Sequence, residues 1–287
     1  MGVPLKKTIQ QSLLVIWIGA TSPFTNKVEA AVDTKSAEHL LRFYRTPELM
    51  DSVYLRFENA LNRHRQDDGV SDMQVRGLAL IGKKIYQGPN LFKILVDAYA
   101  LVISIHDVRD VLEWQKTPLG IRFSHGLKEF FSTPETTLNR YLKKNKFENM
   151  KPNRKNALNT FFKAQEQDAI YVNLETGADL GVLLGLSGYT PEKDREKTDK
   201  IIAQAQGRRL GFSGKSQQQW LRQNFFVLKD LRNDEIDLIS KFAMSAAGQG
   251  HSQALLKALD FTLTAAAKTL RDQVIKESAA ATAQPTR

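Results

Sequence analysis

The stretch Val111–Phe123, VLEWQKTPLGIRF, places an aromatic residue three positions before a Thr-Pro pair and a glycine two positions after the proline. Proline is tolerated at the first position of a helix, where its missing N–H would have had no partner, and a threonine before it can cap the free amides. Trp114 then lies on the last turn of the incoming helix. The stretch therefore predicts a sharp corner between two helices.

Similar corners recur along the chain. Two of them match at a constant offset of 128 positions, in the pairs Val108/Ile236, Val111/Ile239, Trp114/Phe242, Thr117/Ser245 and Gly120/Gly248. A third, weaker copy lies in LLRFYRTPELM, and Thr133-Pro134 and Thr190-Pro191 are also expected to be capped helix starts. This pattern predicts a duplicated helix-corner-helix unit. We interpret its residues as structural, with a ligand site as the alternative: Phe43, Thr46, Pro47, Trp114, Thr117, Pro118, Gly120, Phe242, Ser245 and Gly248.

Helical periodicity dominates the rest of the sequence. Apolar residues recur at spacings of three and four over 40–61, 75–85 and 255–274, and Ser71 with Gln74 forms a capping-box pattern. The best strand candidate, Asp168–Leu174, follows a helical pattern without a break, so we interpret it as helix. The expected fold class is all-α, a multi-helix bundle of antiparallel amphipathic helices.

The first 30 residues have the pattern of a secretory signal peptide. Lys6 and Lys7 precede an apolar run over 13–20, and Val28 and Ala30 are small residues at the positions that a signal peptidase reads. The apolar run has about half the length that a membrane-spanning helix needs. We expect cleavage after Ala30 and export to the periplasm, the alternative being an uncleaved membrane anchor.

Breaks in the helical pattern suggest the organisation of the mature chain. We expect an N-terminal helical part over 31–142, a basic linker over 143–155, a C-terminal helical part over 156–276 and a disordered tail over 277–287. A further loop is expected over Gly207–Ser216. The two helical parts are expected to form one compact unit, with no membrane span in the mature chain.

The charge balance is basic. The net charge of +10 falls to +8 on removal of residues 1–30. Export argues against nucleic acid, so envelope proteins, anionic lipid or cell-wall polymer are the partners that this charge suits. The densest basic run either contacts such an anionic surface or is an ordinary exposed linker: Lys143, Lys144, Lys146, Lys151, Arg154 and Lys155.

No catalytic motif appears in the sequence. The chain has no cysteine, which excludes disulfides and thiolate chemistry. GFSGKS lacks the first glycine of a phosphate-binding loop, and no nucleophile elbow or His-Glu-x-x-His motif occurs. His106 beside Asp107 and Asp110 is the most suggestive cluster, and it is more typical of a helix cap than of a metal site. We therefore expect no cofactor, no metal and no catalytic residue, and favour a protein that is not an enzyme.

The sequence resembles a family of secreted bacterial proteins that carry the domain of unknown function 2059. The resemblance rests on VLEWQKTPLGIRFSHGLKEF and on a C-terminal segment with matching positions Trp220, Leu221, Asp234, Glu235, Phe242, Ser245, Gly248 and Gln249. It covers about Ala37 to Leu270. Ala246 stands after Ser245, where the family usually has proline. The resemblance implies an exported, largely helical bacterial protein whose activity is unknown, and it supplies no catalytic residues.

These observations lead to one expected function and two alternatives. We expect a non-enzymatic periplasmic binding or interaction module of the bacterial envelope. The first alternative is a carrier whose helices enclose an apolar ligand such as a fatty acid, in a cavity lined by the corner aromatics. The second is an envelope hydrolase whose site is assembled from distant residues around His106 or His125.

Overall fold

The computed structural model describes residues 32–67, 70–164 and 168–282. The predicted signal peptide therefore lies outside the described residues. From Ala31 onward the chain forms one compact unit by its contacts. The prediction of an all-α fold is confirmed, because every regular element in the described ranges is a helix.

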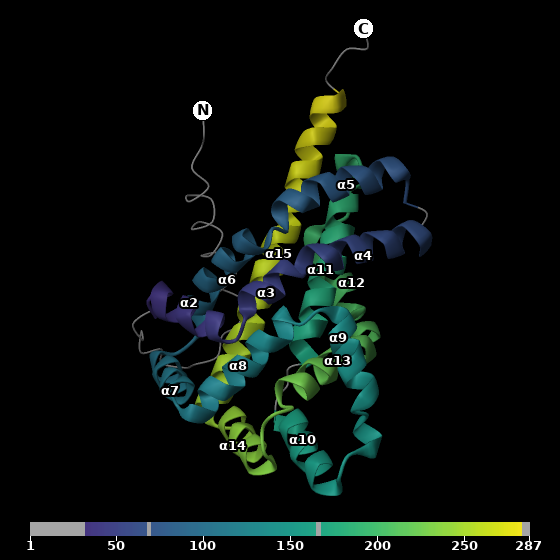
Figure 1. The fold of residues 1–287 in the computed structure, drawn as a ribbon. Helices are drawn as coiled ribbons and strands as arrows, with labels where there is room; N and C mark the ends of the chain where they lie inside the picture. The colour runs from purple at the N-terminus through teal and green to yellow at the C-terminus, as the bar shows by residue number, and fades with distance from the viewer. Residues whose placement is uncertain (1–31, 68–69, 165–167, 283–287) are drawn as a thin grey trace. The chain divides into compact units, whose positions relative to one another are not determined.

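The helices follow one another with short connections (Figure 1). In chain order they are α2 (Thr34–Phe43), α3 (Thr46–Asp51), α4 (Val53–Asp67), α5 (Asp72–Ile85), α6 (Gly88–Val102), α7 (Ile105–Gln115), α8 (Pro118–Ser132), α9 (Glu135–Lys144), η1 (Phe147–Asn149), α10 (Pro152–Ala164), α11 (Asp168–Gly188), η2 (Glu192–Asp194), α12 (Thr198–Gly207), α13 (Arg209–Val227), α14 (Asn233–Ala243) and α15 (Ala246–Thr282). The predicted capping box of Ser71 and Gln74 begins α5.

The core is organised around α11 and α15, which pack against each other more extensively than any other pair of helices (Figure 1). Glycines on α11 make this close approach possible. A Cβ atom on Gly177 would lie 2.6 Å from the Cβ of Leu263, and one on Gly188 would lie 2.8 Å from Cγ1 of Val274. Because both contacts advance in the same direction along the chain, α11 and α15 run parallel to each other.

The remaining helices surround this pair. Helix α4 packs on α11, α5 and α6 pack on α15, and α13 packs on α11. Helix α11 is largely apolar, and Ala169–Gly188 is the one described helical stretch long and apolar enough to cross a membrane; most of it is buried inside the protein.

Three segments differ from the sequence-based expectation. The predicted linker over 143–155 is shorter, because Lys143 and Lys144 complete α9 and Pro152 begins α10. The prediction of a loop over Gly207–Ser216 is wrong, because α13 begins at Arg209 and continues through Gly211 and Gly214. The predicted disorder is wrong for 277–282, which continue α15, whereas 283–287 lie outside the described residues. Short runs of glycine or small polar residues therefore did not end these helices.

Candidate binding groove

The site begins with one face of α13, which carries three apolar residues and a glutamine. Gln217, Trp220, Leu221 and Phe225 are spaced by three and four positions and therefore share one face of the helix. Trp220 is the best anchored of them, because its ring lies edge-on to Phe162 of α10 with centroids 4.7 Å apart. Two helices distant in sequence thus form one aromatic wall.

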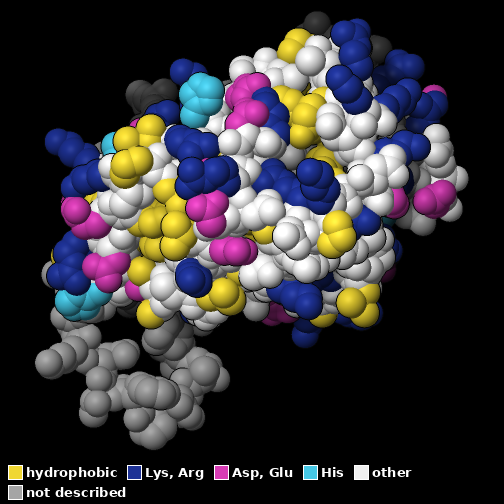
Figure 2. All heavy atoms as spheres, turned by 60° about the horizontal axis from the view of Figure 1, so that its bottom comes forward, with side chains coloured by type: hydrophobic (Ala, Val, Ile, Leu, Met, Phe, Trp, Pro, Cys, Tyr) yellow, Lys and Arg dark blue, Asp and Glu magenta, His cyan; other side chains and the backbone are white. Residues whose placement is uncertain are grey.

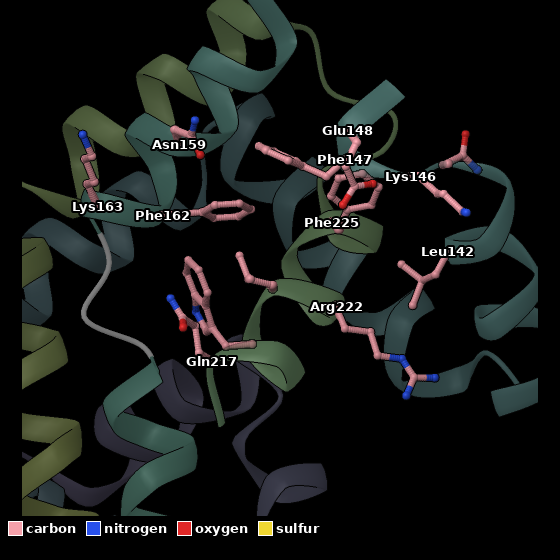
Figure 3. Close-up of a pocket in the computed structure, with 13 residues that line it drawn as sticks. Leu142, Lys146, Phe147, Glu148, Asn159, Phe162, Lys163, Gln217, Arg222 and Phe225 are labelled. Carbon is pink, nitrogen blue, oxygen red and sulfur yellow. The ribbon is translucent and has the colours of Figure 1, made fainter. Parts of the chain in front are cut away.

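Between α9, η1, α10 and α13 lies an open pocket of about 900 Å³, which we call the groove (Figure 3). Its apolar lining consists of Leu142, Phe147, Phe162, Trp220, Leu221 and Phe225, and its polar lining of Asn145, Lys146, Glu148, Asn159, Lys163, Gln217 and Arg222. Small-molecule sites commonly have volumes of about 300–1,000 Å³ and mostly apolar walls with a few polar groups. The groove has the volume of such a site, but its lining is divided about equally between apolar and polar residues.

Aromatic packing holds the apolar part of the groove in place. Phe147 of η1 lies 6.5 Å from Phe162 and 6.3 Å from Phe225, measured between ring centroids. Trp220 is also nearly parallel to Phe161, whose side chain is fully buried. The indole Nε1 of Trp220 is buried and has no hydrogen-bond partner among the described residues. A buried tryptophan N–H usually has a partner, so this donor is a notable feature of the wall.

The charged residues of the groove are mostly cationic. Arg222 donates hydrogen bonds to Glu135 and, at 2.8 Å, to Oδ1 of Asn139, so a carboxylate already offsets its charge. Lys146 and Lys163 form no ion pair with a described residue. Lys and Arg side chains also cover much of the protein face in Figure 2, with fewer Asp and Glu between them.

The predicted basic run divides into residues with different surroundings. Lys146 lines the groove, while Lys143, Lys144 and Lys151 are exposed. Arg154 is half-buried and donates a 2.6 Å hydrogen bond to the carbonyl of Leu228, near the end of α13. Lys155 donates to the carbonyl of Glu148 at 2.8 Å. The run is therefore not one uniform anionic-surface site, because Arg154 and Lys155 tie the backbone together.

The corner aromatics meet at a single place. Trp114 and Phe242 stack with centroids 4.3 Å apart and planes inclined by 3°, and Phe43 lies edge-on to Trp114 at 6.1 Å. Thr117 and Ser245 play the same part in the two matching corners. The Thr117 hydroxyl donates to the carbonyl of Trp114 at 2.7 Å and accepts from the N–H of Gly120 at 3.0 Å. The Ser245 hydroxyl donates to the carbonyl of Phe242 at 2.6 Å and accepts from the N–H of Gly248 at 3.2 Å.

The two corner glycines are required by the same close approach. A Cβ atom on Gly120 would lie 2.4 Å from the carbonyl oxygen of Trp114, and one on Gly248 would lie 2.3 Å from that of Phe242. Pro118 follows Thr117 as the first residue of α8, as expected, and Ala246 takes its place in α15 without changing the local hydrogen bonds. The two corners therefore share their local geometry; a common origin by duplication stays a prediction.

The capping expected at the other Thr-Pro pairs is wrong. Arg45, at φ 57°, precedes α3, so Thr46 is already the first helical residue and Pro47 the second. Thr46 is fully buried, and its Oγ1 has no hydrogen-bond partner in the described part of the chain. Before α9 and η2 the N-cap position is proline, at Pro134 and Pro191. The Thr-Pro pair thus occupies different positions relative to the helix start, because the end of the preceding helix decides where the new helix begins.

The corner leaves little room for a ligand. The aromatic corner and His251 enclose only about 40 Å³, so a fatty acid does not fit there. Nδ1 of His251 lies 2.6 Å from the hydroxyl of Tyr99, and the ring stacks on Tyr44 at 4.5 Å. Burial lowers the pKa of His251 to about 3 and raises that of Tyr99. The imidazole is therefore neutral, and its Nδ1 shares a hydrogen bond with the Tyr99 hydroxyl.

A buried ionic cluster, which we define as Arg56, His64, Glu175 and Asp179, joins α4 and α11, and the exposed Gln219 of α13 contacts it. Arg56 forms an ion pair with Glu175 and donates to Oε1 of Gln219 at 3.0 Å. Nε2 of His64 lies 2.9 Å from Oδ1 of Asp179. Arg208 approaches Oδ2 of Asp179 only to 3.6 Å, beyond direct hydrogen bonding. Sequence analysis missed this cluster, although two carboxylates inside the apolar run of α11 were a signal that partners were needed.

The two histidines considered for catalysis, His106 and His125, are exposed and lie on α7 and α8. Asp107, beside His106, accepts a hydrogen bond from Ser104, the N-cap of α7, at 2.9 Å. His64 has a carboxylate partner, but the side chains of His64 and Asp179 are each only 4% exposed. A substrate has no direct access to that pair.

Comparison with family models, with curated proteins and with solved structures found no match.

Proposed function

We propose that this chain is a non-enzymatic binding module of the bacterial envelope, exported by its N-terminal segment, and that it binds an amphipathic ligand in the groove. The observation that carries the proposal is the groove itself, an open pocket of about 900 Å³ with an aromatic lining and cationic side chains at its edges. Membership of the family with domain of unknown function 2059 is part of the proposal and agrees with an exported helical protein.

The groove replaces the corner as the place for a ligand. Apolar surface that stays open to water loses solvent contact when an apolar chain covers it, which favours binding by about 25 cal/mol per Å² before ordering costs. The corner aromatics enclose only about 40 Å³, whereas the half-buried Phe147 and Phe162 line an open pocket of about 900 Å³. A carrier function is thus supported at the groove and not within the corner.

Binding in the groove is tested by blocking it. Asn159 is exposed and lines the groove, so Asn159→Trp fills the space from α10 without disturbing the core. Asn156, also exposed on α10, lies outside the lining, and Asn156→Trp is the matched control. Native mass spectrometry of each protein, isolated from an envelope fraction, should show a bound amphiphile in wild type and Asn156→Trp and a reduced amount in Asn159→Trp. Equal loading of the two variants would refute the groove as the site.

Export is tested separately. Ala30→Arg places a large charged residue at the position that signal peptidase reads, whereas Glu29→Arg changes the neighbouring position, which it does not read. The expected result is a mass beginning at residue 31 in the periplasm for wild type and Glu29→Arg, with the uncut chain for Ala30→Arg. A wild-type protein that keeps residues 1–30 would refute cleavage.

A further inference from the structure

We infer that the groove binds a long-chain carboxylate, with the carboxylate at the Lys163 end and the apolar chain running toward Phe225 and Leu142. This inference rests on the proposed function, because it names the ligand class and its orientation in the same groove. It follows from the unequal distribution of charge between the two ends of the groove.

The cations of the groove lie apart. Figure 3 shows Lys163 at one side and Lys146 and Arg222 at the opposite side, with Phe162 and Phe225 between them. A single small head group therefore cannot contact both sides. The ligand's charge must be placed at one end, and its apolar part must cover the aromatic side chains that separate the ends.

The Lys146 end holds the one acidic residue in the described lining of the groove. Glu148 lines this end of the groove together with Lys146. Arg222 is paired with Glu135. Lys155 also donates to the Glu148 carbonyl, so this end carries cations beside its carboxylate. An incoming anion here would be repelled by Glu148, which offsets part of the attraction of the cations.

The Lys163 end offers donors and no described acidic partner. Lys163 and Asn159 are four positions apart on α10 and therefore share a face, and Gln217 of α13 lies across the groove from them (Figure 3). Lys163 forms no ion pair with a described residue. An anion at this end thus meets an ammonium group and neutral donors.

The number of cations selects the head group. One lysine offsets one negative charge, which matches a carboxylate. A phosphate monoester carries about −1.5 to −2 at neutral pH and is better matched by a bidentate arginine or by two cations. The aromatic lining beyond this end then takes the alkyl chain, whose burial supplies the remaining affinity.

The test uses the full-length chain labelled with ¹⁵N-tryptophan. Three indole resonances are expected, from Trp17, Trp114 and Trp220, and Trp220→Phe assigns the one in the groove. Laurate, dodecanol and dodecyl phosphate are titrated below their aggregation concentrations. The Trp220 resonance should shift with each bound ligand while that of Trp114 stays in place, and laurate should bind about tenfold more tightly than dodecanol.

Two variants of equal charge change locate the head group. Lys163→Met should abolish the tenfold preference for laurate over dodecanol, leaving dodecanol affinity within about twofold of wild type. Lys146→Met, the matched control at the other end, should keep the preference. Because both lysines are exposed, neither change disturbs the core.

The other outcomes separate the two proposals. A preference that disappears in Lys146→Met instead would overturn the orientation, and tighter binding of dodecyl phosphate than of laurate would overturn the carboxylate. Equal affinity for laurate and dodecanol would overturn the charged head site while keeping the groove as an apolar site. A Trp220 resonance that responds to none of the three ligands would overturn the proposed function together with the inference.

Discussion

Replacing Arg56 tests the buried ionic cluster most directly. The side chains of Arg56 and Glu175 are only 8% and 7% exposed, and their ion pair links α4 to the central helix α11. Arg56→Met keeps most of the apolar stem but leaves the Glu175 carboxylate buried, with Arg63 no closer than 4.0 Å. Breaking one side of a buried ion pair typically costs about 3–5 kcal/mol, because the remaining charge loses its compensation. We expect Arg56→Met to lower the free energy of unfolding by that amount.

The matched control is the exposed pair Arg42–Glu38, whose side chains are 57% and 43% exposed. Exposed pairs contribute about 0.2–1 kcal/mol, so Arg42→Met should change the stability by less than about 1 kcal/mol. Urea unfolding followed by circular dichroism measures both. A second variant, Arg56→Met with Glu175→Leu, removes both buried charges and should be clearly more stable than Arg56→Met alone.

Two results would refute this reasoning. If Arg56→Met costs no more than Arg42→Met, water reaches Glu175 and the cluster is not desolvated. If the double variant is no more stable than Arg56→Met, the loss comes from the packing of the arginine against Tyr171, whose ring centroid lies 5.5 Å from the guanidinium, rather than from the unpaired carboxylate.

Three further predictions concern single positions. Gly248→Ala should destabilise the protein by about 1–3 kcal/mol because the new Cβ meets the Phe242 carbonyl. Gly214→Ala, whose Cβ meets nothing within 4 Å, should stabilise it by about 0.5–1 kcal/mol. The urea midpoints of the two variants should therefore shift from wild type in opposite directions. Thr117→Val should lower the stability by about 1 kcal/mol because it removes the N-cap hydrogen bond of α8. Thr46→Val should leave the stability unchanged or raise it, because the Thr46 hydroxyl is buried and has no partner among the described residues. Equal shifts of the thermal midpoint in the two variants would contradict this prediction. Burial lowers the pKa of His251 to about 3 in the folded protein, against 6.5 when unfolded, so the unfolded chain binds more protons between these pH values. The free energy of unfolding therefore falls as pH falls through that window, by up to about 1.4 kcal/mol per pH unit. A His251→Phe variant should lose this part of the pH dependence, and an unchanged slope would refute the prediction.

The sequence predicted the helical class because helix signals are local. The hydroxyl of Thr117 bonds groups three residues away on either side, and Ser71 caps α5 through Gln74 three residues later. Such contacts need no other part of the chain, so spacing alone was sufficient to predict them. The failure at Thr46 has a local cause too, since the left-handed Arg45 moved the helix start by one residue.

The groove could be predicted only in small part. Lys146 was singled out in the basic run, and Trp220 and Leu221 through the family resemblance, but nothing in the spacing placed them together. Phe162 and Trp220, whose rings meet in the groove, are separated by the whole of α11 and α12. In the sequence, Phe162 and Trp220 have the spacing of ordinary core residues. Only the packing of α10 and α13 in the folded protein places them in the lining of the groove.

By itself, the sequence determined that this protein is a helical bundle with sharp glycine-dependent corners, because helix formation, capping and steric exclusion at glycine act over a few residues. The tertiary structure decided which of these helices meet. It brought Arg56 to Glu175 across 119 positions, stacked Trp114 on Phe242, and left a groove lined by α9, η1, α10 and α13. Those outcomes depend on how close and in which direction helices pack, and the glycines on α11 that let α15 approach exert their effect only when both helices are in place.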